Sequence, residues 1–298
     1  MRENNDYFEN IKIKGAKLEK NKKNRNNSKS AFQDIDFKKS LGQNFLSDKN
    51  LLNSIVKIAN ISDEDVVLEI GAGAGSLTAV LAKFAKKVIS YEIDRSLTDI
   101  LLNLKSNNSN LEIVFEDFMK ADINYLFQEN QRIKVVANIP YYITTPIIFK
   151  LLDFSNNIDL MLFMVQKEVA LRFASKEGKK DYGITSIILQ SIADVSYEKT
   201  VAKECFTPMP KVDSALVKIE LRKDKFNILD FEFFTKLIHT SFSMRRKTLI
   251  NNLTKSFDFS KEYLIENLKK LGYSETVRPE EISVENYVKL SNILKNKK

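Results

Sequence analysis

The chain has 298 residues, of which 43% are hydrophobic, so it is long enough to bury a large apolar core. Its formal net charge is +8, and residues 1–30 hold nine Lys or Arg against four Asp or Glu. One cysteine, Cys205, and one histidine, His239, exclude an internal disulfide framework and a zinc cluster of several Cys and His ligands.

The N-terminal part carries most of the excess charge. Residues 1–36 are rich in Lys and Asn and have too few apolar side chains to fold alone, so we expect a flexible basic extension. It either solubilises the chain or binds the phosphates of a nucleic acid. No apolar run reaches the ~20 residues of a membrane span, and no secretory signal is evident. We therefore expect a cytoplasmic protein without a membrane or metal partner.

From residue 37 onward, short apolar runs alternate with segments of helical period. Strands are predicted where the runs are apolar on both faces, as a buried parallel sheet requires, over 66–70, 87–93, 111–117, 134–139 and 159–165. Helices are predicted over 76–87, 145–154 and 183–193. This β-α-β-α order indicates an α/β fold with a doubly wound, Rossmann-like sheet.

The last part of the chain changes character. Two neighbouring strands are predicted over 195–201 and 214–222, joined by a proline-rich loop, and beyond Lys225 the pattern is wholly helical. We expect a catalytic α/β domain over residues 37–224 and a smaller all-helical domain over 225–298.

Three glycines, Gly71, Gly73 and Gly75, follow the first strand and precede a helix in VVLEIGAGAGSLT. Glycines at such a place let the backbone turn tightly and approach a ligand, with the helix N-terminus beyond. Their spacing differs from the dinucleotide fingerprint G-x-G-x-x-G. Glu69, in the strand just before the loop, strengthens the motif.

Two further carboxylates point to an adenosine ligand. Glu92 ends the second strand, where a carboxylate can accept both ribose hydroxyls, and Asp117 ends the third, where it can contact the adenine amino group. S-Adenosylmethionine fits this set better than a nicotinamide cofactor, which stays an alternative.

The fourth strand delivers Asn138, Ile139, Pro140 and Tyr141 to the same edge of the sheet. The Asn138 side-chain oxygen and a main-chain carbonyl of the Ile139–Pro140 turn can accept the two hydrogens of an adenine amine. The amine nitrogen then becomes more tetrahedral and more nucleophilic, so methyl transfer depends on positioning and electrostatics. Tyr141 offers a ring on which an extruded base can stack. The alternative is a structural strand end with a proline turn.

Eight segments in family order make the chain similar to the ribosomal RNA adenine N6-dimethyltransferases, and most similar to the bacterial small-subunit (16S) branch. They are KKSLGQNFLSD (38–48), LEIGAGAGSLT (68–78), YEID (91–94), NIPYYITTPIIFKLL (138–152), MVQKEVALRFAS (164–175), YGITSIILQ (182–190), CFTPMPKVDSALVKI (205–219) and FSMRRKTLINNL (242–253).

The resemblance implies roles for single residues. Contacts to S-adenosylmethionine are implied at Asn44, Leu46, Gly71, Glu92, Asp117 and Asn138. Position 44 is commonly His in this family, and Asn can still donate and accept hydrogen bonds. Ile139 and Tyr142 also depart from the usual Asn-Leu-Pro-Tyr-Asn. Phe206 resembles the ring that closes the target pocket from the other side, with plain packing as the alternative.

The same resemblance implies RNA contacts. Arg245, Arg246 and Lys247 stand together at the start of a predicted helix, and Lys211 lies in the proline loop. We expect these four residues to bind RNA phosphates, although a run of charges is more often a solvated face. The helical domain over 225–298 is then the RNA-recognition domain.

The expected activity is dimethylation of N6 of two adjacent adenines in a hairpin loop near the 3′ end of small-subunit rRNA. The expected partner is rRNA in a partly assembled small subunit, and the expected state is a monomer. Two alternatives stay open: a resistance-type enzyme acting on large-subunit (23S) rRNA, and a non-catalytic RNA-binding assembly factor on the same fold.

Overall fold

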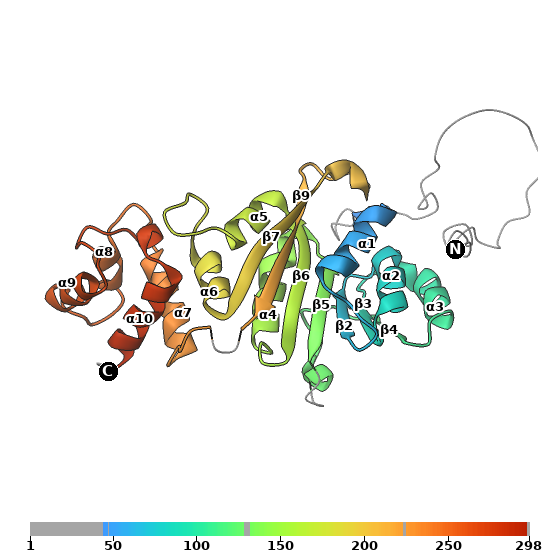
Figure 1. Ribbon diagram of the computed structural model, residues 1–298, viewed down its shortest axis with the longest axis horizontal. Coiled ribbons are helices and arrows are strands. Elements are labelled where there is room, and N and C mark those ends of the chain that lie inside the picture. The colour runs from blue at the N-terminus through green and yellow to red at the C-terminus, as the bar shows by residue number, and fades with distance from the viewer. Residues whose placement is uncertain (1–43, 47, 128–131, 223–224, 297–298) are drawn as a thin grey trace, which may run out of the picture.

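The computed structural model describes residues 44–46, 48–127, 132–222 and 225–296 (Figure 1). The predicted basic extension over residues 1–36 lies outside the described residues. In the part of the chain that the structure describes, no helix combines the length and the apolar composition that crossing a membrane requires.

The described residues form a seven-stranded sheet whose five consecutive parallel strands confirm the predicted doubly wound architecture. Across the sheet the order is β4 (Leu111–Val114), β3 (Lys87–Tyr91), β2 (Val66–Ile70), β5 (Ile133–Asn138), β6 (Ile158–Gln166), β9 (Ser214–Leu221) and β7 (Ala193–Val201). The strand β9 runs antiparallel to both β6 and β7, so the two strands predicted around the proline loop do lie side by side.

Helices cover both faces of the sheet, which explains why all five residues of β2 are buried. On one face, α1 (Lys49–Ile58) and α2 (Ser76–Phe84) share an apolar cluster with Val67, Val88 and Val136. On the other face, α4 (Thr144–Leu152), α5 (Lys167–Phe173) and α6 (Ile184–Ile192) pack in a second cluster with Leu68 and Val135.

Several element ends differ from the predictions for identifiable reasons. The helix predicted to Lys87 ends at Phe84, because Lys87 already opens β3. The helix α1 was not predicted, and Asp48 caps it by accepting from the main-chain N–H groups of Asn50 and Leu51 at 2.8 and 3.0 Å.

The carboxyl ends of β3 and β4 come earlier than predicted. The strand β3 ends at Tyr91 and β4 at Val114, so Glu92 and Asp117 lie in the loops that follow these strands. The helix α3 (Thr98–Ser106) stands between the two strands in the chain. Both carboxylates are therefore held by loop structure at the edge of the sheet.

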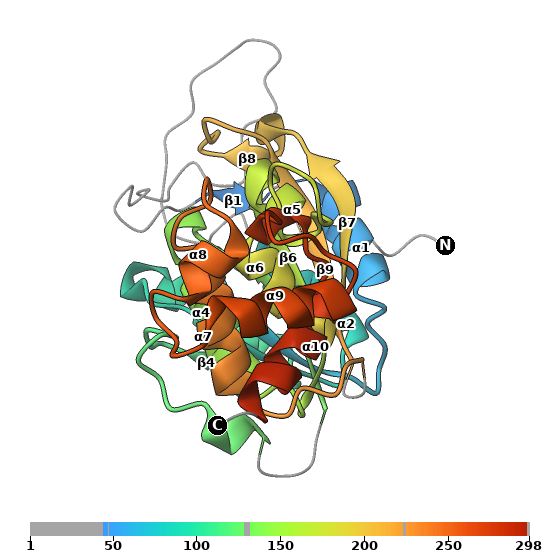
Figure 2. The same cartoon turned by 90° about the vertical axis from the view of Figure 1, so that its left-hand side faces the viewer.

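The helices beyond residue 225 form one end of the molecule in Figure 1 and face the viewer in Figure 2. They are α7 (Phe231–Ser241), α8 (Leu249–Leu253), α9 (Lys261–Lys270) and α10 (Val284–Lys295). One apolar cluster continues from the sheet through α6 into α7 and α10. The buried Tyr182 hydroxyl donates to the Ile282 carbonyl at 2.9 Å across this junction. The change from strands to helices thus occurs within one continuous core.

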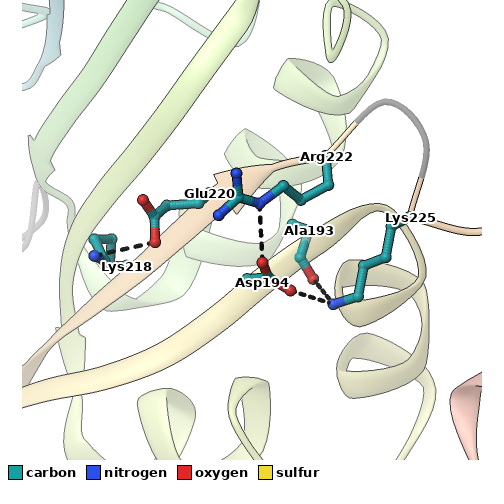
Figure 3. A network of polar contacts seen from close by, with 6 residues as sticks. All are labelled: Ala193, Asp194, Lys218, Glu220, Arg222 and Lys225. Atoms are coloured by element: carbon teal, nitrogen blue, oxygen red, sulfur yellow. Dashed lines mark hydrogen bonds and ion pairs between the residues drawn. The ribbon is translucent and has the colours of Figure 1, made fainter.

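A polar network fixes the point where the chain leaves the sheet for these helices (Figure 3). The Asp194 carboxylate on β7 accepts from Arg222 Nε at 2.9 Å and from Lys225 Nζ at 2.7 Å. Lys225 Nζ also donates to the Ala193 carbonyl at 2.6 Å. Lys225 and Arg222 hold the pKa of the Asp194 carboxyl below its usual range. Arg222 and Lys225, which stand on either side of positions 223–224, therefore both bind to β7.

Candidate active site

One cavity of about 250 Å³ opens at the carboxyl ends of β2, β3 and β5 and beside the turn after β4. All six residues for which a cofactor contact is implied line it: Asn44, Leu46, Gly71, Glu92, Asp117 and Asn138. Ile139 and Pro140 line it as well. The structure thus brings together residues from five separate parts of the sequence at the edge of the sheet where a doubly wound fold binds its ligand.

The glycine loop makes room for the cavity by its backbone. Gly73 has a φ of +56°, and a Cβ added there would lie 2.9 Å from Cε1 of Phe45. Phe45 belongs to the short strand β1 (Phe45–Leu46), which crosses this loop and also lines the cavity. Only glycine combines this left-handed backbone with so close an approach. The sequence reasoning named both neighbours of Phe45 and missed Phe45 itself.

Glu92 holds the glycine loop against the end of β3. Its carboxylate accepts from the main-chain N–H groups of Gly73 and Asp94, each at 2.7 Å, and the residue is only 6% exposed. Burial raises the pKa of this carboxyl, although the Asp94 and Gly73 N–H groups oppose that effect. Each carboxylate oxygen has a second lone pair, so Glu92 can still accept hydroxyl groups of a ligand.

Asp117 lies three residues beyond β4, in a turn. Its Oδ1 accepts from the Met119 N–H at 3.0 Å, and its Oδ2 lies 3.8 Å from Lys120 Nζ. The side chain is 30% exposed and lines the cavity. The backbone uses one lone pair of Oδ1, so the carboxylate keeps acceptor positions for an amine of a ligand.

Asn138, the last residue of β5, has its amide orientation fixed. Its Nδ2 donates to the main-chain carbonyl of Asn44 at 3.0 Å. Only the nitrogen end of the amide can donate to a carbonyl, so the opposite end, Oδ1, is an acceptor. The segment before β1 therefore sets which end of the Asn138 amide a ligand meets.

The residues after Asn138 form a short turn. Ile139 is 1% exposed, and the Pro140 carbonyl accepts from the Ile143 N–H at 3.1 Å. The 3₁₀ turn Tyr141–Ile143 follows. The backbone of Tyr141 is thus placed, whereas its side chain lies outside the described part of the structure. Tyr142 lines the cavity with a side chain that is 63% exposed.

Phe206 does not line the cavity in this structure. It is 4% exposed, its strand β8 (Phe206–Thr207) pairs antiparallel with β1, and it stands opposite Leu46. Both residues belong to the same buried apolar cluster. This placement fits the packing alternative, and the role of the ring in closing a target pocket stays a prediction.

Glu69 is a second buried carboxyl close to the loop. It is 0% exposed, and the Ser90 hydroxyl donates to its Oε2 at 2.6 Å. Burial raises the pKa of Glu69 to about 7, against the lowering effect of the Ser90 hydroxyl. Glu69 lies below the glycine loop and does not line the described cavity, so it supports β2 and β3 from within.

The predicted RNA-binding cluster lies in the turn between α7 and α8, just before the helix start that the sequence predicted. Arg246 and Lys247 are exposed there. Arg245 Nη2, however, donates to the carbonyls of Lys180 and Tyr182 at 2.9 and 3.3 Å. These bonds attach the turn between α7 and α8 to the loop before α6, a contact that could not be predicted from the sequence.

Lys211 is exposed in the loop between β8 and β9, beside the exposed Met209 and Val212. The single histidine, His239, lies on α7, away from the cavity. Among the described residues, no group of three His, Cys, Asp or Glu side chains is arranged to hold a metal ion.

The residues of the cavity fit the adenosine part of S-adenosylmethionine. A Cβ on Gly73 would fill the space against Phe45, and the backbone there is close enough to touch a ligand. Glu92 and Asp117 offer acceptors for ribose hydroxyls and for the adenine amine. Asn138 lines the same cavity.

Comparison with known proteins identifies the family of the chain. The model of a family described as ribosomal RNA adenine dimethylase matches residues 35–296. Ribosomal RNA small subunit methyltransferase A of Bacillus mycoides (strain KBAB4) is 44% identical over 268 residues, covering 87% of this chain and 92% of that protein. The protein of the same name from Bacillus anthracis (strain CDC 684 / NRRL 3495) has the same identity and coverage.

Two solved structures share both fold and sequence. A dimethyladenosine transferase from Plasmodium falciparum superposes with a TM-score of 0.73 at 29% identity, covering 85% of this chain and 98% of that chain. The 23S rRNA methyltransferase ErmE superposes with a TM-score of 0.67 at 26% identity, covering 85% and 100%. With its family model matched over nearly the whole described length, the chain belongs to the ribosomal RNA adenine dimethylase family.

Proposed function

We propose that this enzyme dimethylates N6 of two adjacent adenines in a hairpin loop near the 3′ end of small-subunit rRNA. The observation that carries the chemistry is the orientation of the Asn138 amide by the Asn44 carbonyl. The choice of the small subunit is supported by relatives named small subunit methyltransferase A at 44% identity.

S-Adenosylmethionine, when bound, supplies a sulfonium methyl group. Glu92 binds the ribose hydroxyls, Asp117 accepts from the adenine amine, and β1 with Leu46 covers the ligand from the side of the glycine loop. Glu92 also fixes Gly73, so one carboxylate both shapes the loop and binds the ligand. These contacts orient the reacting methyl group and exclude water from it.

Two acceptors prepare the target amine. Asn138 Oδ1 accepts one N6 hydrogen, and a main-chain carbonyl accepts the other. We assign the second role to the carbonyl of Ile139, the residue directly after Asn138, whose own side chain is buried as an anchor. Both acceptors favour a tetrahedral nitrogen, whose lone pair would form the new C–N bond to the methyl carbon. The C–S bond of the sulfonium would break with its electron pair going to sulfur, and one N6 proton would leave to solvent.

The target base is held by stacking. Tyr141 supplies the ring face, and the exposed Tyr142 lies next to it at the mouth of the cavity. Phe206 supports β1 by pairing opposite Leu46. Stacking is the same for every adenine, so selection of one hairpin loop depends on contacts farther away.

Those distant contacts are made by basic residues in two exposed loops, the turn between α7 and α8 and the loop between β8 and β9. Arg246, Lys247 and Lys211 bind phosphates of a partly assembled small subunit in the cytoplasm, and Arg245 holds the turn between α7 and α8 in place. The enzyme acts as a monomer, with the all-helical domain over 225–298 as its RNA-recognition part.

The test is transfer of labelled methyl groups to isolated small-subunit precursors, to large subunits and to short oligonucleotides, followed by mapping of the modified nucleotides. We expect two dimethylated adenines on the small-subunit precursor and little label elsewhere. Label on the large subunit instead would favour methylation of 23S rRNA, the activity for which ErmE is named. Tight RNA binding without label would favour a non-catalytic assembly factor.

A further inference from the structure

Lys150, on α4, directs its ammonium group at the turn that follows β4. Nζ donates to the carbonyls of Phe118, Met119 and Ala121 at 2.7, 3.2 and 2.7 Å. It also lies 5.2 Å from the centroid of the Phe118 ring. A lysine ammonium has three N–H donors, so each donor has a main-chain acceptor in this one turn.

The turn that Lys150 holds is part of the cofactor cavity. Asp117, Phe118 and Met119 all line it. From the other side, the N–H groups of Lys120 and Ala121 donate to the Asp117 carbonyl, each at 2.9 Å. The N–H groups of the turn are thus engaged by Asp117, and its carbonyls are engaged by Lys150.

The helix α4, which carries Lys150, also comes directly after the turn that follows β5. It begins at Thr144, directly after the turn Tyr141–Ile143, so Lys150 connects the helix behind the target amine with the loop at the adenine end of the cavity. A hydrogen bond from a charged donor is roughly twice as strong as a neutral one. Three such bonds converging from one atom make the turn rigid before any ligand binds.

We propose that Lys150 is a positioning residue, which holds residues 117–121 so that the Asp117 carboxylate meets the adenine of S-adenosylmethionine. This rests on the proposed function of the cavity. An arginine cannot replace it fully, because the donors of a guanidinium are spread over a planar fork and do not converge from one nitrogen.

The first test compares ligand affinity with turnover. Lys150→Met keeps the length of the side chain and removes the charge and the three donors. We expect the Kd of S-adenosylhomocysteine, measured by calorimetry, to rise about tenfold, with kcat at saturating cofactor lowered by less than about threefold. Lys57→Met, an exposed change on α1, is the matched control and should leave both values unchanged.

Lys150→Arg keeps the charge and replaces the methionine variant if that variant does not fold. We expect it to raise the Kd by about threefold, between the parent and Lys150→Met. A kcat that falls in proportion to the affinity in either variant would overturn the positioning role, because general damage to the site affects both constants.

The second test asks whether Lys150 acts through Asp117. Asp117→Asn keeps Oδ1 as the acceptor of the Met119 N–H and replaces the other carboxylate oxygen by a donor. In that background, Lys150→Met should change the Kd by less than about twofold, because the contact that Lys150 positions is already lost. A further tenfold loss of affinity in the double variant would overturn the proposal.

Amide hydrogen exchange of the ligand-free protein gives a readout that does not involve the cofactor. In Lys150→Met the amides of Lys120 and Ala121 should exchange at least about tenfold faster, while those of β2 stay protected. A parent that binds no S-adenosylhomocysteine would overturn the proposed function itself. A parent that binds it, with Lys150→Met binding equally tightly, would overturn only the role of Lys150.

Discussion

The Asn138 side-chain nitrogen donates to the Asn44 main-chain carbonyl at 3.0 Å, although the two residues are 94 positions apart. This bond joins the segment that precedes β1 to the end of β5. It leaves Oδ1 as the only end of the Asn138 amide that a substrate amine can use. The orientation of the catalytic acceptor is thus a property of the fold before any ligand is bound.

Replacing Asn138 by alanine should lower turnover far more than cofactor affinity. The lost acceptor matters most as charge develops on the amine nitrogen, so kcat should fall by about 10²–10³. The Kd of S-adenosylhomocysteine should rise by only a few-fold, since the ribose and adenine contacts remain. Single-turnover methyl transfer and calorimetry separate the two effects, and Asn103→Ala on α3 is an exposed control. Near-parental kcat in Asn138→Ala would contradict the assigned role.

Gly73→Ala should displace β1 from the cavity. The new Cβ would lie 2.9 Å from the Phe45 ring on a backbone with φ +56°. We expect cofactor affinity to fall by about tenfold or more, with a stability loss of about 1 kcal/mol from the left-handed backbone. Gly272→Ala is the matched control, because φ there is +86° and nothing lies within 4 Å of the new Cβ. It should show the stability loss in urea unfolding without the loss of affinity.

Glu69 should make the protein less stable as the pH rises. Its folded pKa of about 7 lies above the ordinary value of 4.5, so the folded chain holds the proton more tightly than the unfolded chain. This stabilising contribution is complete below pH 4.5 and is lost as the pH passes 7, a change of about 3 kcal/mol at most.

Glu69→Gln removes this titration and keeps the shape of the side chain. Urea unfolding of the parent and the variant between pH 5 and pH 8 should give a difference in unfolding free energy that grows in favour of the variant by about 2–3 kcal/mol. A constant difference for Glu69→Gln would mean that its pKa is ordinary.

Local patterns in the sequence were sufficient to predict the strands and the acidic and amide residues of the cavity. The runs that form β2, β3 and β5 are apolar on both faces because both faces are covered, and a ligand at the carboxyl ends of such strands follows from parallel topology. The strands predicted around the proline loop, β7 and β9, lie side by side as expected.

Residues that bond to main-chain carbonyls could not be predicted in this way. Lys150 meets its acceptors 29 to 32 positions away, and Arg245 meets a carbonyl 65 positions away. Every residue has a carbonyl, so the sequence of the acceptor carries no signal. For Phe206 the missing information was different: its burial depends on the pairing of two very short strands far apart in the chain.

Arg245 and its two neighbours should differ in how they affect the salt dependence of RNA binding. Each phosphate contact contributes about 0.7–0.9 to the slope of log Kobs against log salt. The double variant Arg246→Ala/Lys247→Ala should therefore give a slope shallower by about 1.4–1.8 on small-subunit precursor RNA. Arg245 donates to the carbonyls of Lys180 and Tyr182, so Arg245→Met should weaken binding with the slope unchanged.

The reason for this contrast is that a displaced surface loses affinity without losing a counterion-releasing contact of its own. Filter binding of labelled precursor RNA at several salt concentrations measures both quantities. Lys105→Ala, exposed on α3 near the opposite end of the molecule in Figure 1, controls for the loss of one positive charge. If the slope for Arg245→Met is shallower by the amount expected for one phosphate contact, Arg245 binds phosphate directly. Its bond to the loop before α6 would then be secondary.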